Sequence, residues 1–143
     1  HRCSKLLADS LMHYAMEHEG SYPRSDREGA LALAGVVTQG THDPDFVLEL
    51  VVGKAGDLKD AERFWEKRGY LKPEHSSWHY VEGLTEEDEG LALAWDKIPL
   101  SHNGARMSSN PREVIMVGGM VRQVNEAQWA QFLERQEALR RER

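Results

Sequence analysis

Closely spaced histidines are the first residues whose types suggest chemistry. His75 and His79 lie four residues apart, the spacing at which two imidazoles on one helix face can bind a metal ion. Pro73 and the aromatic stretch 78–81 instead favour an extended segment. Residues four apart in a strand are separated by about 13 Å. We therefore expect surface histidines and no metal site here.

Carboxylates gather in two places. Asp43 and Asp45 flank Pro44, and residues 86–89 form an acidic run. Such oxygens suit calcium, but a calcium loop needs about six to eight ligands and a glycine at its sharp turn. The pattern favours solvated acidic faces, and the question of a bound calcium ion stays open at this point.

Candidate nucleophiles lack the neighbours that would activate them. Cys3 has no identifiable base beside it, and a catalytic thiol needs one. Ser101, His102 and Asp96 supply the residue types of a hydrolase triad, but no nucleophile elbow surrounds that serine. The sequence therefore predicts no catalytic, cofactor-binding or metal-binding residues, and a protein that is not an enzyme.

Composition narrows the function classes further. The chain has 143 residues, 40% of them hydrophobic and 29% charged, with a net charge of -6. An acidic chain lacks the basic footprint that nucleic-acid binding requires. A single cysteine excludes an intramolecular disulfide. The longest apolar run, residues 30–37, is too short to cross a bilayer and contains Gly35.

The first element is an amphipathic helix, predicted over residues 2–19. Leu7, Leu11 and Ala15 recur at helical spacing, and Gly20 is the expected residue after its end. No capping signal precedes position 2. We therefore expect this helix to be the C-terminal half of a longer one that begins before residue 1.

The middle of the chain is predicted to be helical and irregular. We expect a short helix over 29–38, a loop over 40–45 and a helix over 57–68 that ends before Gly69. Residues 46–52 form an apolar run whose periodicity does not distinguish helix from strand.

The last part of the chain predicts an antiparallel sheet within residues 78–124. Gly118-Gly119 suits a two-residue type I′ turn between two of its strands, and Asn125 is the expected cap of a closing helix over 126–141. A long loop is expected over 99–111. The strands are expected at 78–81, 91–96, 113–117 and 120–124, and in the second of them Leu91, Leu93 and Trp95 are expected to alternate against Ala92, Ala94 and Asp96. Residues 1–143 thus predict one α+β domain: an N-terminal amphipathic helix on a small antiparallel sheet, extra short helices and a C-terminal helix.

Two blocks of sequence resemble a known family. Cys3-Ser4-Lys5-Leu6-Leu7 through Tyr22-Pro23 resembles the segment that follows the cleaved hydrophobic helix of bacterial prepilin-type proteins. The stretches 93–97, 102–104 and 114–121 are similar to the C-terminal block of pseudopilins of the general-secretion-protein-G-like kind. Gly118 and Met120 stand where that family usually has Asp and His, so no role of those two residues carries over.

The resemblance implies a type IV pilin-like domain with a non-enzymatic, structural function. Its expected partners are other pilin-like subunits of a pilus or type II secretion pseudopilus, with no nucleic acid and no cofactor. A helix before residue 1 would anchor it in the inner membrane and place residues 1–143 in the periplasm or outside the cell. The alternative is a stand-alone extracytoplasmic module that binds a small ligand or peptide.

Overall fold

Helices and strands occupy separate parts of the chain, which makes the fold α+β as predicted. The computed structural model describes residues 2–25, 27–38, 43–99 and 111–143. In chain order its elements are α1 (Arg2–Glu17), η1 (Ala32–Val36), α2 (Pro44–Val52), α3 (Leu58–Arg68), η2 (Pro73–His75), β1 (Trp78–Tyr80), β2 (Ala92–Asp96), β3 (Arg112–Met116), β4 (Val121–Val124) and α4 (Glu126–Arg141).

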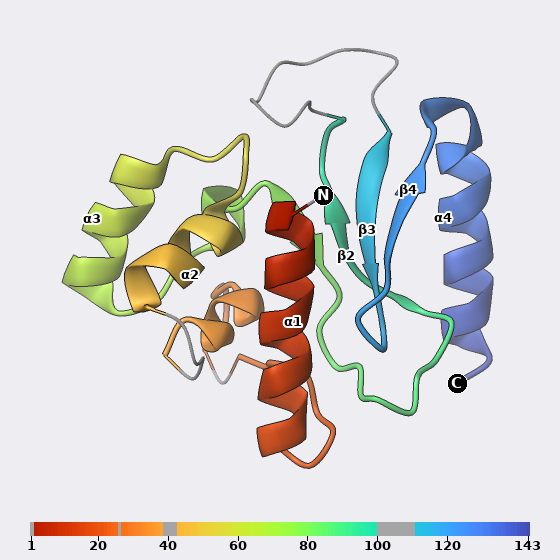
Figure 1. Ribbon diagram of the computed structural model, residues 1–143, viewed down its shortest axis with the longest axis horizontal. Helices are drawn as coiled ribbons and strands as arrows, with labels where there is room; N and C mark the ends of the chain where they lie inside the picture. The colour runs from red at the N-terminus through yellow and green to blue at the C-terminus, as the bar shows by residue number, and fades with distance from the viewer. Residues whose placement is uncertain (1, 26, 39–42, 100–110) are drawn as a thin grey trace.

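The four strands form one antiparallel sheet in the order β1-β2-β3-β4. Helices α1 and α2 cover one face of this sheet, and α4 covers the other (Figure 1). Each face has its own apolar cluster. The larger cluster contains Leu7, Leu11, Val47, Leu93 and Ile115, and the smaller contains Ala92, Trp95, Val114, Met116 and Val124. The sheet is therefore buried on both sides.

Helix α1 is shorter at its C-terminal end than predicted. It ends at Glu17, and Glu19 adopts a left-handed backbone with φ 57°. The N–H of Gly20 then bonds to the carbonyl of Ala15 at 2.7 Å, which is the closing bond of a Schellman motif. The C′ position is occupied by Glu19, and Gly20, the residue expected there, follows it with φ 87°.

The apolar run 46–52, which periodicity leaves undecided, is helical. It belongs to α2, which begins at Pro44 with Asp43 as its N-cap, so the loop predicted over 40–45 ends earlier than expected. Proline at the first helical position and aspartate before it are strong start signals. The helix predicted over 29–38 is reduced to the 3-10 turn η1.

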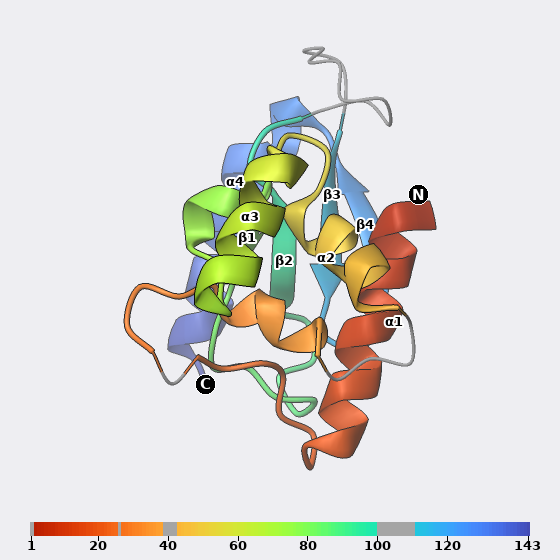
Figure 2. The same cartoon turned by 90° about the vertical axis from the view of Figure 1, so that its left-hand side faces the viewer.

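Helix α3 follows its sequence signals closely. The carboxylate of Asp57 accepts the N–H of Asp60 at 3.1 Å, and Gly69 ends the helix with φ 76°. Figure 1 shows α3 beyond α2, at the opposite end of the molecule from α4, and α3 faces the viewer in Figure 2.

Strand β2 contradicts the predicted alternation of Leu91, Leu93 and Trp95 on one face. Its register against β3 shifts between Ala92 and Ala94. Leu93 and Ala94 therefore both join the cluster under α1, whereas Trp95 joins the cluster under α4. A β-bulge inserts one residue and reverses which face the following side chains occupy.

In the hairpin between β3 and β4, Gly118 and Gly119 both have positive φ angles, 98° and 92°, as the predicted type I′ turn would require. The predicted two-residue turn is wrong, because β3 ends at Met116 and β4 begins at Val121. The N–H of Gly119 bonds to the carbonyl of Met116 at 2.9 Å, and the N–H of Met116 to the carbonyl of Met120 at 2.8 Å.

Helix α4 occupies the range predicted for it, although the Asn125 side chain makes no capping bond. Gln136 joins it to the sheet. Its Oε1 accepts the N–H of Ala92 at 2.8 Å, and its Nε2 donates to the carbonyl of Gly90 at 3.1 Å. A buried amide that satisfies two backbone groups fixes α4 against the start of β2.

Helix α1 and the β3–β4 hairpin touch closely. A Cβ placed on Gly119 would lie 2.0 Å from Met12 Sδ, so the glycine leaves room for this sulfur. The N–H of Gly118 donates to the Tyr22 hydroxyl at 3.1 Å. Both turn glycines therefore help to seat the first helix on the sheet.

Gly119→Ala should destabilise the protein more than Gly118→Ala. Each variant places Cβ at a positive φ, at a cost of about 1–2 kcal/mol, but a Cβ on Gly118 meets nothing within 4 Å. Met12 is flexible and 37% exposed, so displacing its side chain should add only about 0.5–1.5 kcal/mol to the cost at Gly119. Urea unfolding measures both, and Met12→Ala combined with Gly119→Ala should recover the difference. Equal costs at the two glycines would contradict the contact.

Candidate functional site

The described chain buries two carboxylates where β2 ends and β3 begins. Asp96 is the last residue of β2 and Glu113 the second of β3, and they are 3% and 2% exposed. Aspartate and glutamate are almost never this buried unless they are paired. The partners of these two residues therefore define the site.

Glu113 connects three other elements through its carboxylate and backbone. Its Oε2 accepts a hydrogen bond from the hydroxyl of Ser4 in the first turn of α1. Its Oε1 lies 3.7 Å from Nζ of Lys54, which follows α2. Its backbone N–H donates to Asp96 Oδ2 at 2.9 Å. We call Ser4, Lys54, Asp96 and Glu113 the α1 clamp.

Burial governs the electrostatics of the α1 clamp. Desolvation raises the pKa of Asp96 above its ordinary value, and the nearby charge of Glu113 acts in the same direction. The N–H bond from Glu113 and the positive charge of Lys54 oppose this rise. A carboxylate whose charged form is disfavoured by burial binds its proton more tightly.

The α1 clamp attaches α1 to the sheet. The Ser4 hydroxyl donates a hydrogen bond to the carboxylate of Glu113 on β3, and this bond holds α1 to that strand. Buried hydrogen bonds to charged groups are stronger than neutral ones, and losing one partner leaves a costly buried acceptor. The clamp therefore fixes the position of the first turn of α1.

A shallow hollow of about 300 Å³ lies beside the clamp. Cys3, Phe46, Leu50, Lys54 and Trp78 are among its lining residues. Two other hollows, of about 240 and 210 Å³, adjoin the segment around Leu31. All three are at or below the lower end of ligand-pocket volumes, about 300–1,000 Å³.

The structure gives His75 and His79 different partners. His75, in η2, accepts the N–H of Lys72 through Nδ1 at 2.9 Å. His79, in β1, stacks on Trp95 with ring centroids 4.6 Å apart, and burial lowers its pKa. Within the described part of the chain, no group of three or more His, Cys, Asp or Glu residues is arranged to hold a metal ion.

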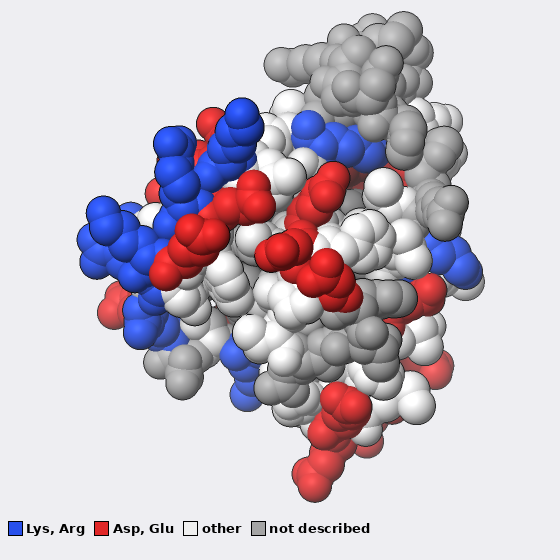
Figure 3. All heavy atoms as spheres, turned by 60° about the vertical axis from the view of Figure 1, so that its left-hand side comes forward, with Lys and Arg blue, Asp and Glu red and all other residues white. Residues whose placement is uncertain are grey.

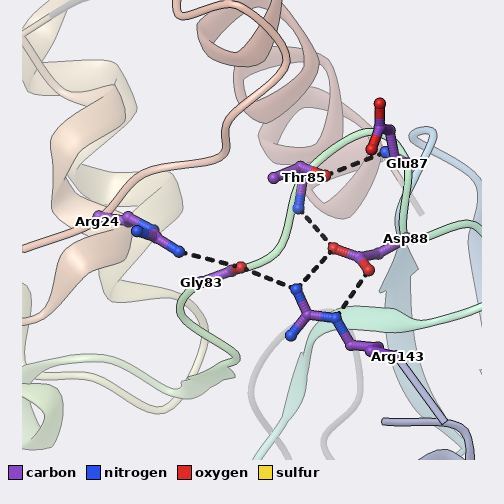
Figure 4. Close-up of polar contacts among 6 residues, drawn as sticks. All are labelled: Arg24, Gly83, Thr85, Glu87, Asp88 and Arg143. Carbon is purple, nitrogen blue, oxygen red and sulfur yellow. Dashed lines mark hydrogen bonds and ion pairs between the residues drawn. The ribbon is translucent and has the colours of Figure 1, made fainter.

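The acidic candidates are used in local structure. Asp43 caps α2. In the run 86–89, Asp88 Oδ2 accepts the N–H of Thr85 at 2.9 Å, and Arg143 donates to both oxygens of the Asp88 carboxylate at 2.8 and 3.2 Å (Figure 4). A cation at Asp88 would have to displace this arginine.

The other sequence candidates do not converge. Cys3 is an exposed free thiol. Asp96 belongs to the α1 clamp, whereas Ser101 and His102 lie outside the described residues. Gly118 and Gly119 serve the hairpin. No helix among the described residues has the length and apolarity needed to cross a membrane.

The α1 clamp is not among the sites that the sequence predicts. Its one available signal was a carboxylate, Glu113, at the start of the apolar run 113–117. An acid in an apolar strand indicates a buried partner, but the sequence does not identify Ser4, 109 residues away. Comparisons with protein-family models, curated proteins and solved structures find no match for this chain.

Ser4→Ala should lower the free energy of unfolding by about 1–3 kcal/mol, because Glu113 loses a buried donor. Ser10→Ala is the matched control: Ser10 is equally a buried serine of α1, but its hydroxyl bonds within the helix to the carbonyl of Leu6. Hydrogen exchange of residues 6–9 should accelerate in the Ser4 variant alone. Similar effects of both variants would show that the clamp contributes little.

Asp96→Asn should become more favourable relative to the wild type as the pH rises. A folded-state pKa above the unfolded one gives stability that is present below about pH 4 and is lost as the pH rises through the folded pKa. The Asp96→Asn variant has no carboxyl group to titrate at this position, so it does not lose this part of its stability as the pH rises. Denaturant unfolding at pH 4 to 7 measures the difference, with Asp9→Asn on the exposed face of α1 as control. A constant difference for Asp96→Asn would contradict the raised pKa.

Proposed function

We propose that this chain is the globular domain of a pilin-like or pseudopilin-like structural subunit, without enzymatic activity, in the bacterial cell envelope. A helix preceding residue 1 would continue α1 into the inner membrane. The domain itself would lie in the periplasm or outside the cell, with other pilin-like subunits as its partners.

The observation that carries this proposal is the attachment of α1 along its whole length. Its first turn is bonded to β3 through Ser4 and Glu113. Its middle is buried through Leu7 and Leu11, both 0% exposed. Beyond its last turn, the Tyr22 hydroxyl accepts the hairpin N–H of Gly118.

Such attachment suits a helix that transmits force. A helix held at its first turn keeps its direction, so a preceding helical segment would project from the domain at a fixed angle. The outer side of α1 also carries an exposed apolar side chain, Met16, which is 74% exposed, and Met12 beside it, which contacts the hairpin, is 37% exposed. Exposed methionines are frequent at adaptable protein-binding surfaces, which supports assembly with other subunits.

A binding module for a small ligand receives less support. Its function would need an apolar pocket with convergent polar groups. The hollow beside the α1 clamp, about 300 Å³, is the most suitable one described, but Lys54 on its wall lies close to Glu113. The structural subunit is therefore the better proposal.

Expression of the gene from its own start codon tests the proposal. The protein should fractionate with the inner membrane, resist extraction at high pH, and cross-link in the envelope to other pilin-like subunits. Residues 1–143 expressed alone are the control and should be recovered without membrane.

The proposal fails if the codons before His1 encode no stretch of about 20 apolar residues. It also fails if the complete protein is recovered from the cytosol, or if its envelope cross-links contain no pilin-like chain.

A further inference from the structure

Helix α3 presents a row of three cations. Lys59, Arg63 and Lys67 repeat every four residues and are all exposed. None of the ion pairs found among the described residues involves them. Figure 3 shows Lys and Arg side chains gathered at the left of the molecule, where α3 lies. We call these three residues the basic row.

Helix α1 presents two exposed carboxylates, Asp9 and Glu17, on one i, i+4 ridge that begins one turn earlier with the exposed cation Lys5. His13 lies between the two carboxylates, with its Nε2 3.2 Å from Glu17 Oε1. We call Asp9 and Glu17 the acidic row. Met12 and Met16 lie beside this row, so apolar surface accompanies the negative charge.

The two rows match in length and direction on their helices. Each covers nine residues, and its first and last members are about 12 Å apart along the helix. Both follow an i, i+4 ridge of their helix. Within one molecule α2 lies between α1 and α3 (Figure 1), so the rows are free to meet those of another copy.

We propose that the basic row of one copy docks on the acidic row of a second copy. This inference rests on the proposed function, because it names the surface through which subunits would meet. The aliphatic stems of Lys59 and Lys67 would cover Met12 and Met16. Since the two surfaces differ, the contact is head-to-tail and can repeat into an open chain of subunits.

The composition of α3 favours this partner over a polyanion. Asp60, Glu62 and Glu66 lie among the cations of α3, so α3 lacks the continuous positive face that a nucleic acid or an anionic lipid surface requires. A single carboxylate row of matching spacing meets the basic row without requiring a uniformly positive face. Exposed ion pairs contribute little individually, so the contact of isolated domains is weak.

A carbodiimide that joins carboxylates directly to lysines tests the contact. An equal mixture of unlabelled and 15N-labelled protein at low salt should give mixed-isotope links from Asp9 or Glu17 to Lys59 or Lys67. At about 1 M salt, where the Debye length is about 3 Å, their yield should fall about tenfold, as expected for loss of a few exposed pairs.

Charge exchange supplies the decisive control. Asp9→Lys with Glu17→Lys, or Lys59→Glu with Lys67→Glu, should each abolish these links when alone. A mixture of the two variants should restore links between the exchanged rows. Glu134→Lys with Glu137→Lys on α4, an equal charge change across the sheet, should leave the yield unchanged.

The inference is overturned if the links are confined to single molecules, if the two variants fail to complement each other, or if the α4 control loses the links equally. Complete protein that still assembles in the envelope when both rows are neutralised would overturn this inference alone and leave the proposed function standing. Absence of any assembly by the complete wild-type protein would instead remove the proposed function.

Discussion

The buried bond between the Ser4 hydroxyl and the Glu113 carboxylate is the constraint on which the rest of the structure depends. A carboxylate inside a protein is tolerated only when its oxygens are paired. Glu113 meets this requirement with groups from α1 and from the segment after α2, while its backbone binds Asp96. The Glu113 carboxylate thus connects β3 to α1 and to the segment after α2, and apolar packing alone would not fix these elements in one register.

Apolar packing determines which face of α1 is buried, but it does not determine where the helix lies along the sheet. Leu7, Leu11 and Ala15 repeat regularly enough that the sequence predicts which side of the helix is buried, and all three are buried. A hydrophobic stripe is non-directional, so several registers against the sheet would bury it. The Ser4 bond at one end and the contact of Met12 with Gly119 nearer the other select one register.

Local signals predict much of the fold, and tertiary contacts decide the rest. The Asp57 cap and Gly69 define α3 because their effects act within a few residues. The run 46–52 was undecided because a fully buried helix and a buried strand are equally apolar. The bulge in β2 escaped prediction because alternation describes a regular strand, whereas register depends on pairing with β3. The α1 clamp escaped for the same reason, since it joins residues 109 positions apart.

A clamped α1 would also give the proposed contact between copies a defined geometry. Because Ser4 and Met12 hold α1 against β3 and the hairpin, Asp9 and Glu17 would keep a fixed position relative to Lys59 and Lys67 on the same domain. The angle between successive copies in the proposed contact would then be set by the fold rather than by flexible side chains. A head-to-tail contact closes into a ring or continues as a filament according to that angle. Weakening the Ser4 bond would therefore change the angle between copies in the proposed assembly without changing the charged residues that form the contact.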